Sequence, residues 1–159
     1  MLSFFFDTNI LVYVFDRAES VKQAQAQDLV TLHMTARNMV LSTQVLQELY
    51  VTLTRKKQLG AADALEVVTT FAQERVVPAS ADLVLRGLAL SHSSQLSAWD
   101  ALIVQSALDA GCTTLYSEDF QNGMRFDDLV IVNPFVLQAH EPGSGLVGAT
   151  RARSRARPR

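Results

Sequence analysis

The sequence predicts an α/β fold, a three-layer sandwich with a central, mostly parallel five-stranded sheet. Short apolar runs recur along the chain without alternating polar and apolar residues, which is typical of strands that are buried on both faces. Segments with helical periodicity lie between these runs, and strands that alternate with helices build parallel sheets covered by helices. The chain has 159 residues, 48% of them hydrophobic, which suits one domain of this kind.

The strands are predicted where aromatic and branched residues are densest. They cover residues 4–6, 39–41, 76–77, 114–116 and 129–132. Helices are predicted between them, at 18–38, 46–53, 61–74, 81–90 and 97–110. The second of these carries apolar residues at the i, i+3, i+4, i+7 spacing of one helical face, namely Leu46, Leu49, Tyr50 and Leu53. Glu48 lies nearly opposite this stripe on a helical wheel, which predicts a side chain facing solvent.

Charge divides the chain into an acidic body and a basic tail. Residues 1–140 carry nine basic and fifteen acidic side chains, a net charge of −6, and we expect them to form the folded domain. Residues 141–159 hold five arginines and one acid among Gly, Ser and Ala, which predicts a disordered tail. Its Gly143-x-Gly145-x-x-Gly148 matches a dinucleotide-binding fingerprint by letters, but the strand and helix that this motif requires are absent, so we reject it.

Three features indicate a cytoplasmic protein without a membrane partner. The longest stretch without charged residues, Gly87 to Trp99, is shorter than the roughly 18 apolar residues of a membrane span. The N-terminus has no basic region ahead of its apolar run, so we expect no signal peptide. The single cysteine, Cys112, cannot form a disulfide framework.

Four acidic residues are the candidate site. Asp7 and Asp119 follow the strands at 4–6 and 114–116, at the edge of the sheet where parallel folds bind ligands. Asp100 lies in the first turn of the helix at 97–110, and Glu48 lies early in the helix after the second strand. Gathered carboxylates repel one another unless a cation or a shared proton offsets their charge. Oxygen ligands without His or Cys favour Mg²⁺ or Mn²⁺, and such a site suits phosphodiester hydrolysis.

Each acid also has a purely structural interpretation. Asp7 is a possible N-cap of a helix that begins just after it. Asp100 follows Ser97 by three residues, which is the spacing of a capping box. Asp119 suits a turn. On these grounds alone the alternatives stay open.

Four segments in order along the chain favour the functional interpretation. They are Phe4–Tyr13 with its Asp-Thr-Asn turn, Leu41–Tyr50 with a glutamate, Ser97–Ile103 with a third acid, and Leu115–Phe120 followed by Ile131–Phe135. Together they resemble PIN-domain proteins, in particular the VapC-like toxins of bacterial toxin–antitoxin pairs. The resemblance covers roughly residues 2–136.

The resemblance implies a metal-dependent endoribonuclease whose acids Asp7, Glu48, Asp100 and Asp119 share one or two Mg²⁺ or Mn²⁺ ions. It implies that Asp7 and Asp100 are metal ligands. It implies that Glu48 binds metal or positions the attacking water. This role requires Glu48 to face the site, whereas the helical wheel predicts that it faces solvent. It also implies three partners: an RNA substrate, a VapB-like antitoxin whose C-terminal segment enters the acidic groove, and a second copy of the chain in a homodimer.

One position departs from the family pattern. Many relatives have an acid where this chain has Ser117, so either Asp119 alone completes the site or Ser117 contributes a hydroxyl. Thr8 and Asn9 are expected to support Asp7 through hydrogen bonds. Two alternative functions follow: a metal-dependent DNA nuclease or phosphatase on the same acids, or a degenerate, non-catalytic PIN fold that binds RNA or protein.

Several other side chains receive simpler interpretations. Arg55-Lys56-Lys57 complements the dipole at the end of a helix more readily than it contacts RNA. Arg17, Lys22 and Arg37 are candidate phosphate contacts, and Trp99 is expected to pack against the fold. The three histidines, His33, His92 and His140, show no metal-binding spacing.

Overall fold

A six-stranded sheet forms the centre of the protein in a computed structural model that describes residues 1–136. The strands are β1 (Phe4–Phe6), β2 (Met39–Ser42), β3 (Arg75–Val77), β4 (Thr114–Tyr116), β5 (Arg125–Phe126) and β6 (Leu129–Val132). Their order across the sheet is β3-β2-β1-β4-β6-β5. Neighbouring strands from β3 to β6 are parallel, and only β5 is antiparallel to its neighbour. All five predicted strands are therefore present.

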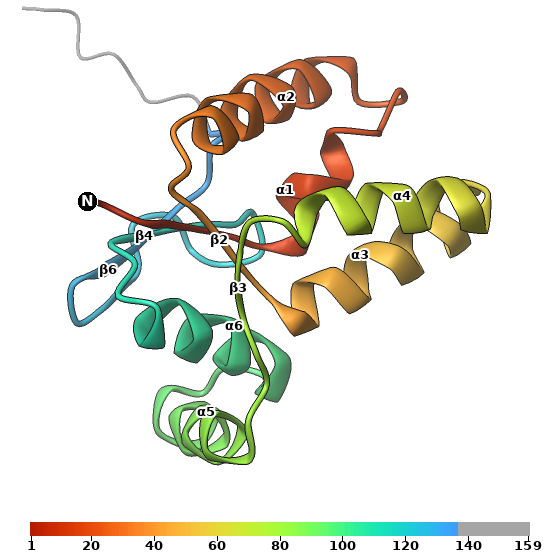
Figure 1. Cartoon of the computed structure of the whole chain (residues 1–159). Helices are drawn as coiled ribbons and strands as arrows, with labels where there is room; N and C mark the ends of the chain where they lie inside the picture. Colours follow the sequence, from red (N-terminus) through yellow and green to blue (C-terminus); the bar gives the residue numbers. More distant parts are fainter. Residues whose placement is uncertain (137–159) are drawn as a thin grey trace, which may run out of the picture.

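Helices cover the sheet on both sides, which confirms the three-layer prediction. They are α1 (Thr8–Tyr13), α2 (Ser20–Thr35), α3 (Thr43–Arg55), α4 (Ala61–Phe71), α5 (Ala81–Ser94) and α6 (Ala98–Asp109). In Figure 1, α2 lies above the sheet and α5 and α6 lie below it, while α3 and α4 extend beyond the carboxyl ends of β1 and β2. This arrangement places α1 and α3 next to each other at the carboxyl edge.

The central strands are covered on both faces, and most of their residues are apolar. Phe5 pairs with Val40 on one side and with Leu115 on the other, and all three side chains are buried. Burying a large apolar side chain contributes roughly 1.5–3 kcal/mol each. The continuous apolar runs seen in the sequence therefore correspond to strands packed between helices.

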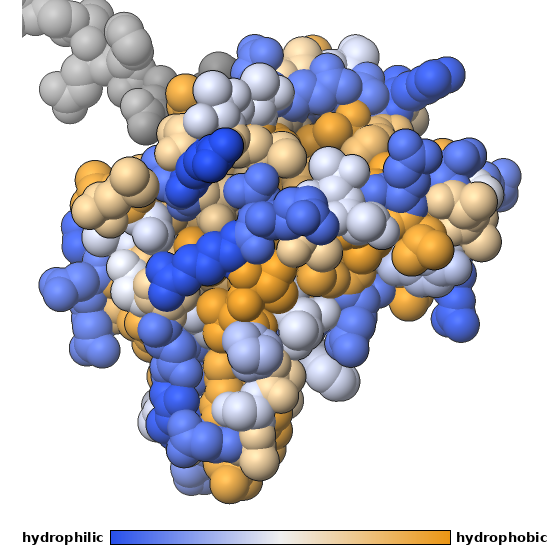
Figure 2. All heavy atoms as spheres, viewed as in Figure 1, coloured by the Kyte–Doolittle hydropathy of each residue, from blue (hydrophilic) through white to orange (hydrophobic). Residues whose placement is uncertain are grey.

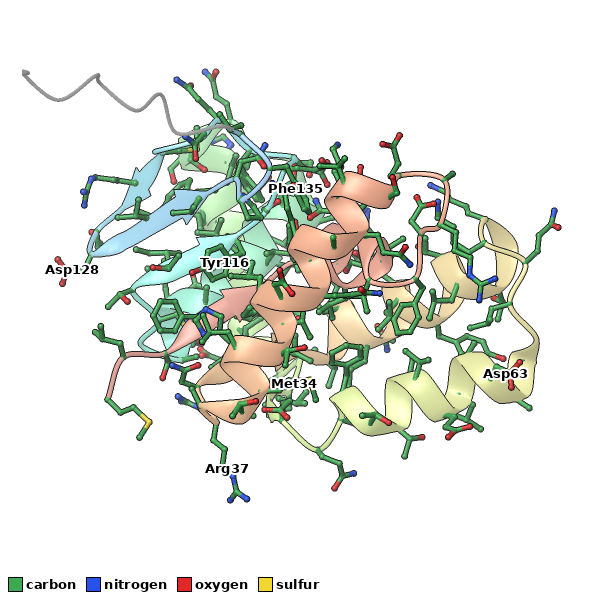
Figure 3. The ribbon with its side chains drawn as sticks, turned by 90° about the horizontal axis from the view of Figure 1, so that it is seen from above. Met34, Arg37, Asp63, Tyr116, Asp128 and Phe135 are labelled. Carbon is green, nitrogen blue, oxygen red and sulfur yellow. The ribbon has the colours of Figure 1, made fainter. Side chains whose placement is uncertain are left out.

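The sixth strand was not predicted. β5 contains two residues and joins β6 through a two-residue turn in which Asp127 has a left-handed φ of +50°. Figure 3 shows Asp128, the second turn residue, at the tip of this hairpin. A strand of two residues is too short for the periodicity that reveals the others, so the count of five was one too few.

Close packing between α5 and α6 positions the first turn of α6, where Asp100 lies. A Cβ atom at Gly87 of α5 would come within 2.6 Å of Leu102 Cδ2 on α6, so glycine is needed for this approach. Arg86 of α5 also donates two parallel hydrogen bonds, of 2.6 and 2.7 Å, to the Asp109 carboxylate at the end of α6. This ion pair holds the pKa of Asp109 below its ordinary value.

Two further expectations concern membrane-spanning helices and the C-terminal tail. None of the helices at residues 1–136 has the length and hydrophobicity that crossing a membrane requires. The predicted boundary at residue 140 and the predicted disordered tail at 141–159 lie outside the described residues.

Candidate active site at the carboxyl edge of the sheet

Asp7 is a buried carboxylate at the carboxyl end of the central strand β1, with 6% of its surface exposed. Its Oδ1 accepts a 2.7 Å hydrogen bond from the Thr8 backbone N–H, which makes Asp7 the N-cap of α1. Burial raises the pKa of Asp7 from its ordinary 3.8 to about 6. Hydrogen bonds from Ser117 and Thr8 lower this pKa, whereas the charges of Asp119 and Glu48 raise it further. The N-cap and the predicted site are thus one carboxylate.

Ser117 connects the end of β4 to Asp7. Its hydroxyl donates a 2.7 Å hydrogen bond to Asp7 Oδ2 and accepts from Asn9 Nδ2 at 3.4 Å and from the Asp119 backbone N–H at 3.2 Å. A serine hydroxyl offers one donor and two acceptor positions, so all three are occupied here. The predicted support of Asp7 by Asn9 is therefore indirect and passes through Ser117.

Glu48 lies beside the same turn. Its Oε2 accepts a 3.0 Å hydrogen bond from the Thr8 hydroxyl, and its Oε1 accepts a 2.8 Å bond from Gln44 Nε2. Thr8 therefore supports Asp7 through its backbone and holds Glu48 through its side chain. The two acids meet because α1 and α3 begin at the ends of adjacent parallel strands.

The solvent-facing position of Glu48 on the helical wheel is wrong. The buried residues of α3 are Val45, Leu49 and Leu53, whereas the stripe used for the wheel included Leu46 and omitted Val45. At 100° per residue, this shifts the centre of the buried face and places Glu48 about 100° from it rather than opposite. That direction points to α1 and the cavity between the two helices.

The other two acids differ in their relation to Asp7. Asp119 follows β4, and its charge acts on Asp7. Asp100 is half-buried in the first turn of α6, where its backbone N–H donates to the Ser97 N-cap hydroxyl at 3.1 Å. Gln44 links this turn to Glu48, because its Nε2 also donates to the Trp99 carbonyl at 3.3 Å. The structure thus brings Asp7, Glu48 and Asp119 together and leaves the side chain of Asp100 without a hydrogen bond to them.

A cavity of about 400 Å³ lies beside this site, and Glu48 and Asp119 are the two predicted site acids that line it. One wall comes from α1 and the other from α3, and Glu118 and Asp119 complete it. Its lining includes Thr8, Asn9, Val12, Tyr13, Asp16, Glu48, Thr52, Lys56, Lys57, Glu118 and Asp119. Lys57 forms an ion pair with Asp16 and holds the end of α3 to the segment after α1.

A second polar cluster at the cavity was missed by sequence reasoning. The Tyr13 hydroxyl donates a 2.6 Å hydrogen bond to Glu118 Oε1, and Lys22 Nζ lies 3.0 Å from Glu118 Oε2. Phe135, which Figure 3 shows beside α2, packs edge-on against the Tyr13 ring at 4.9 Å between centroids. Lys22 is therefore occupied by a carboxylate, which disfavours the phosphate contact expected for it. The only signal in the sequence was the position of Glu118 next to Asp119.

Two other predictions have definite outcomes. Trp99 is 67% exposed, so the expectation that it packs against the fold is wrong. His33 is buried, and its Nδ1 lies 2.8 Å from Asn38 Oδ1 while its ring packs on Phe4, Phe6 and Tyr116. This is a structural histidine, as its lack of metal-binding spacing indicated.

Comparison with known families identifies this arrangement. The family model for the PIN domain matches residues 4–124, which is most of the chain. The chain belongs to the PIN domain family. None of the curated protein sequences compared with it matched.

Solved structures share the PIN fold with this chain at low sequence identity. A toxin–antitoxin complex from Klebsiella pneumoniae is 22% identical, with a TM-score of 0.62 over 84% of this chain and 98% of the other. VapBC2 from Rickettsia felis, bound to a promoter DNA fragment, is 19% identical, with a TM-score of 0.58 over 82% and 97%. The toxin VapC20 from Mycobacterium tuberculosis, named as cleaving the sarcin–ricin loop, is 21% identical, with a TM-score of 0.57 over 74% and 92%.

The site of this PIN domain suits a hydrated Mg²⁺ ion. Within residues 1–136, no three acidic, His or Cys side chains are grouped tightly enough to enclose a metal. Mg²⁺ does not require such a cage, because proteins commonly bind it through one or two carboxylates while it keeps several waters. Asn9 Oδ1 is a buried acceptor without a donor among the described residues, and metal-bound water would supply one. The donors are all oxygens, and burial raises the pKa of Asp7, so its ionised form is unfavourable without a compensating charge.

Proposed function

We propose that this PIN domain is a Mg²⁺-dependent endoribonuclease and the toxin of a VapBC-like pair, with Mn²⁺ as a substitute ion. The observation that supports it best is the convergence of Asp7, Glu48 and Asp119 at the carboxyl edge of the sheet, beside an open cavity that Glu48 and Asp119 line. The fold that it shares with VapBC proteins and with a sarcin–ricin-loop-cleaving toxin points to the same activity.

The residues of the site have different roles in the proposed reaction. Asp7, held rigid by Thr8 and Ser117, is the principal metal ligand, and Asp119 or Asp100 supplies a second carboxylate. When bound, Mg²⁺ supplies Lewis-acid chemistry for hydrolysis of a phosphodiester, leaving a 5′-phosphate and a 3′-hydroxyl. Each Glu48 oxygen accepts one hydrogen bond and keeps a lone pair to orient the attacking water.

The hydrogen bonds of Ser117 favour Asp119 as the acid that completes the site. Both lone pairs of the Ser117 hydroxyl already accept hydrogen bonds, which leaves none for an ion. Asp119 is exposed, and no side-chain hydrogen bond holds its carboxylate among the described residues. Ser117 therefore acts by positioning Asp7. The role of Asp100 as a ligand stays a prediction.

Cleavage by the purified full-length chain tests the proposal. We expect single-stranded RNA to be cut in Mg²⁺ or Mn²⁺ and to stay intact in EDTA, with 5′-phosphate ends on the products. Asp7→Asn should abolish cleavage, and Asp100→Asn should do so if Asp100 is a ligand. Asp28→Asn, on the exposed side of α2, makes the same change in charge away from the site and should leave the rate unchanged.

The same assay separates the alternative functions. Preferential cleavage of single-stranded DNA or of small phosphate esters would replace the ribonuclease with a DNA nuclease or a phosphatase. Binding of RNA without cleavage, with Asp7→Asn indistinguishable from the native chain, would establish a non-catalytic module.

An apolar groove between α3 and α4 suits the proposed antitoxin. It has a volume of about 430 Å³ and is lined by Leu46, Gln47, Tyr50, Val51, Leu65 and Val68. Leu65 is 59% exposed and Val51 is 45% exposed, so the groove presents apolar surface to solvent. An apolar antitoxin segment that fills this groove lies close to the acidic cavity on the other side of α3. The toxin–antitoxin complexes that share the fold support this kind of partner.

Growth of cells tests the groove. A co-produced antitoxin that relieves toxicity of the native chain should fail to relieve that of Leu65→Glu, because the carboxylate cannot enter an apolar contact without a large desolvation cost. Relief that is equal for both chains would exclude the groove as the docking site.

The proposed homodimer needs a different surface. Figure 2 shows hydrophobic side chains gathered over the lower part of one face, where α5 and α6 lie. Leu85 and Leu88 of α5 are exposed there. If this surface forms the dimer, the native chain should sediment as a dimer and Leu85→Glu should sediment as a monomer. A dimer of unchanged stability would place the interface elsewhere.

A further inference from the structure

One face of α3 connects the acidic site to a lysine. Glu48, Thr52 and Lys56 are spaced four residues apart, which places them on one side of the helix, and all three line the cavity. At 1.5 Å per residue, Lys56 lies about 12 Å along the helix from Glu48. The cavity therefore has carboxylates at one end and a cation at the other.

The two lysines at the basic end have different environments. Lys57 is bound to Asp16, a buried acid, and this ion pair fixes the two walls of the cavity against each other. Lys56 is exposed and forms no ion pair with any carboxylate of residues 1–136. Lys56 is thus the cavity cation that is available for an anionic ligand.

We propose that Lys56 binds a backbone phosphate of a single-stranded nucleic acid that lies along α3, a few nucleotides away from the phosphate that is cut. This inference rests on the proposed function, because it assumes that the acidic end of the cavity receives a phosphodiester. Each strand of duplex DNA rises about 3.4 Å per nucleotide along its axis, so a separation of about 12 Å exceeds one nucleotide step. Lys56 then sets how the strand is aligned in the cavity and takes no part in the reaction itself.

The neighbouring Arg55 distinguishes this role from a general charge effect. Both residues lie at the C-terminal end of α3 and complement its dipole in the same way. Arg55 is exposed but does not line the cavity. Substituting each residue separately changes the net charge and the helix end equally, and only Lys56→Ala removes a cation from the cavity.

Binding of a fluorescein-labelled single-stranded RNA 12-mer tests the inference without requiring cleavage. The assay uses the full-length chain with the substitution Asp7→Asn, in EDTA, so that the RNA is bound but not cleaved. Fluorescence anisotropy of the labelled RNA is measured from 50 to 300 mM NaCl. Lys56→Ala should weaken binding at low salt roughly two- to fivefold. It should also reduce the slope of log K against log salt by about 0.7, the contribution of one phosphate contact on a single strand. Arg55→Ala should leave the slope unchanged, and Lys56→Arg should restore it.

Kinetics of the Mg²⁺-loaded chain provide a second measurement. Lys56→Ala should raise KM for RNA and leave kcat unchanged, because the contact is made equally in the ground state and the transition state. Equal losses for Lys56→Ala and Arg55→Ala, or no change in the salt slope for Lys56→Ala, would overturn the inference even if RNA is cleaved. Binding that depends on Lys56 in a chain that does not cleave RNA would support the inference and refute the ribonuclease proposal.

Discussion

Replacing Asp7 with asparagine should stabilise the metal-free protein at neutral pH. An ionised carboxylate in a buried site is unfavourable, and the pKa of Asp7 is raised from 3.8 to about 6. A difference of about two pKa units corresponds to about 3 kcal/mol of unfolding free energy. Asparagine has nearly the same shape, and its Oδ1 can still accept from the Thr8 backbone N–H, but its amide nitrogen cannot accept the hydrogen bond that Ser117 donates. The net gain in stability should therefore be smaller than the charge effect alone.

The pH dependence gives this prediction its sign. Between pH 3.8 and 6 the folded chain keeps a proton on Asp7 that the unfolded chain has lost, so the contribution of Asp7 to stability falls as pH rises through this range. Below pH 3.8 both states are protonated, and above about pH 6 both are ionised. The advantage of Asp7→Asn should therefore be absent near pH 3.8, increase up to about pH 6 and stay constant above it.

Urea denaturation in EDTA at pH 4.5, 5.5, 6.5 and 7.5 measures the effect. The difference between variant and native chain cancels the other titrating groups, and Asp28→Asn controls for net charge on the surface. Adding Mg²⁺ at pH 7.5 should stabilise the native chain by about 2.7 kcal/mol at 100 times its Kd and leave Asp7→Asn unaffected. If the difference in unfolding free energy between Asp7→Asn and the native chain is the same at every pH, the argument that burial raises the pKa of Asp7 is refuted.

Three further substitutions test the packing around the site. Ser117→Ala removes the 2.7 Å hydrogen bond to Asp7, so it should raise the pKa of Asp7 further, which carboxyl NMR titration would measure. It should also lower the unfolding free energy at neutral pH by about 1–3 kcal/mol, measured by urea denaturation. Gly87→Ala forces Leu102 away from a contact of 2.6 Å and should cost about 1–3 kcal/mol, visible as a lower Tm; an unchanged Tm would show that α6 moves freely. Leu53→Ala opens a cavity in the core and should cost about 2–5 kcal/mol in urea denaturation.

The fold was largely predictable because its strands are buried on both faces. Such strands must be continuous apolar runs, and a run like Phe4–Phe6 is visible without any knowledge of its neighbours. The two-residue strand β5 was not predictable, because its antiparallel pairing depends on the turn at Asp127 and Asp128 rather than on hydrophobicity. Local patterns therefore revealed the strands whose environment is uniform and missed the one that tertiary pairing creates.

The site was less predictable, because its contacts join distant segments. Spacing placed Asp7 and Asp119 at the correct edge, but it could not show that Ser117 would use its whole hydrogen-bonding capacity between them. The wheel failed for Glu48 because α3 packs against α4, α1 and β2, and an apolar stripe drawn across more than one contact face has the wrong centre. Which face of a helix meets a cavity depends on the neighbouring helix, and the sequence of one helix does not contain that information.

The structural and functional interpretations of Asp7 turn out to be the same fact. As the N-cap of α1, Asp7 turns the chain sharply at the end of β1, and this turn brings Thr8 to Glu48 and Asn9 to Ser117. The same position removes the carboxylate from water and raises its pKa, so ionisation of Asp7 is unfavourable without a compensating charge. A cap at an exposed helix end would have no such cost. The burial of this cap, rather than its presence, is what supports the proposed metal site at the carboxyl edge of the sheet.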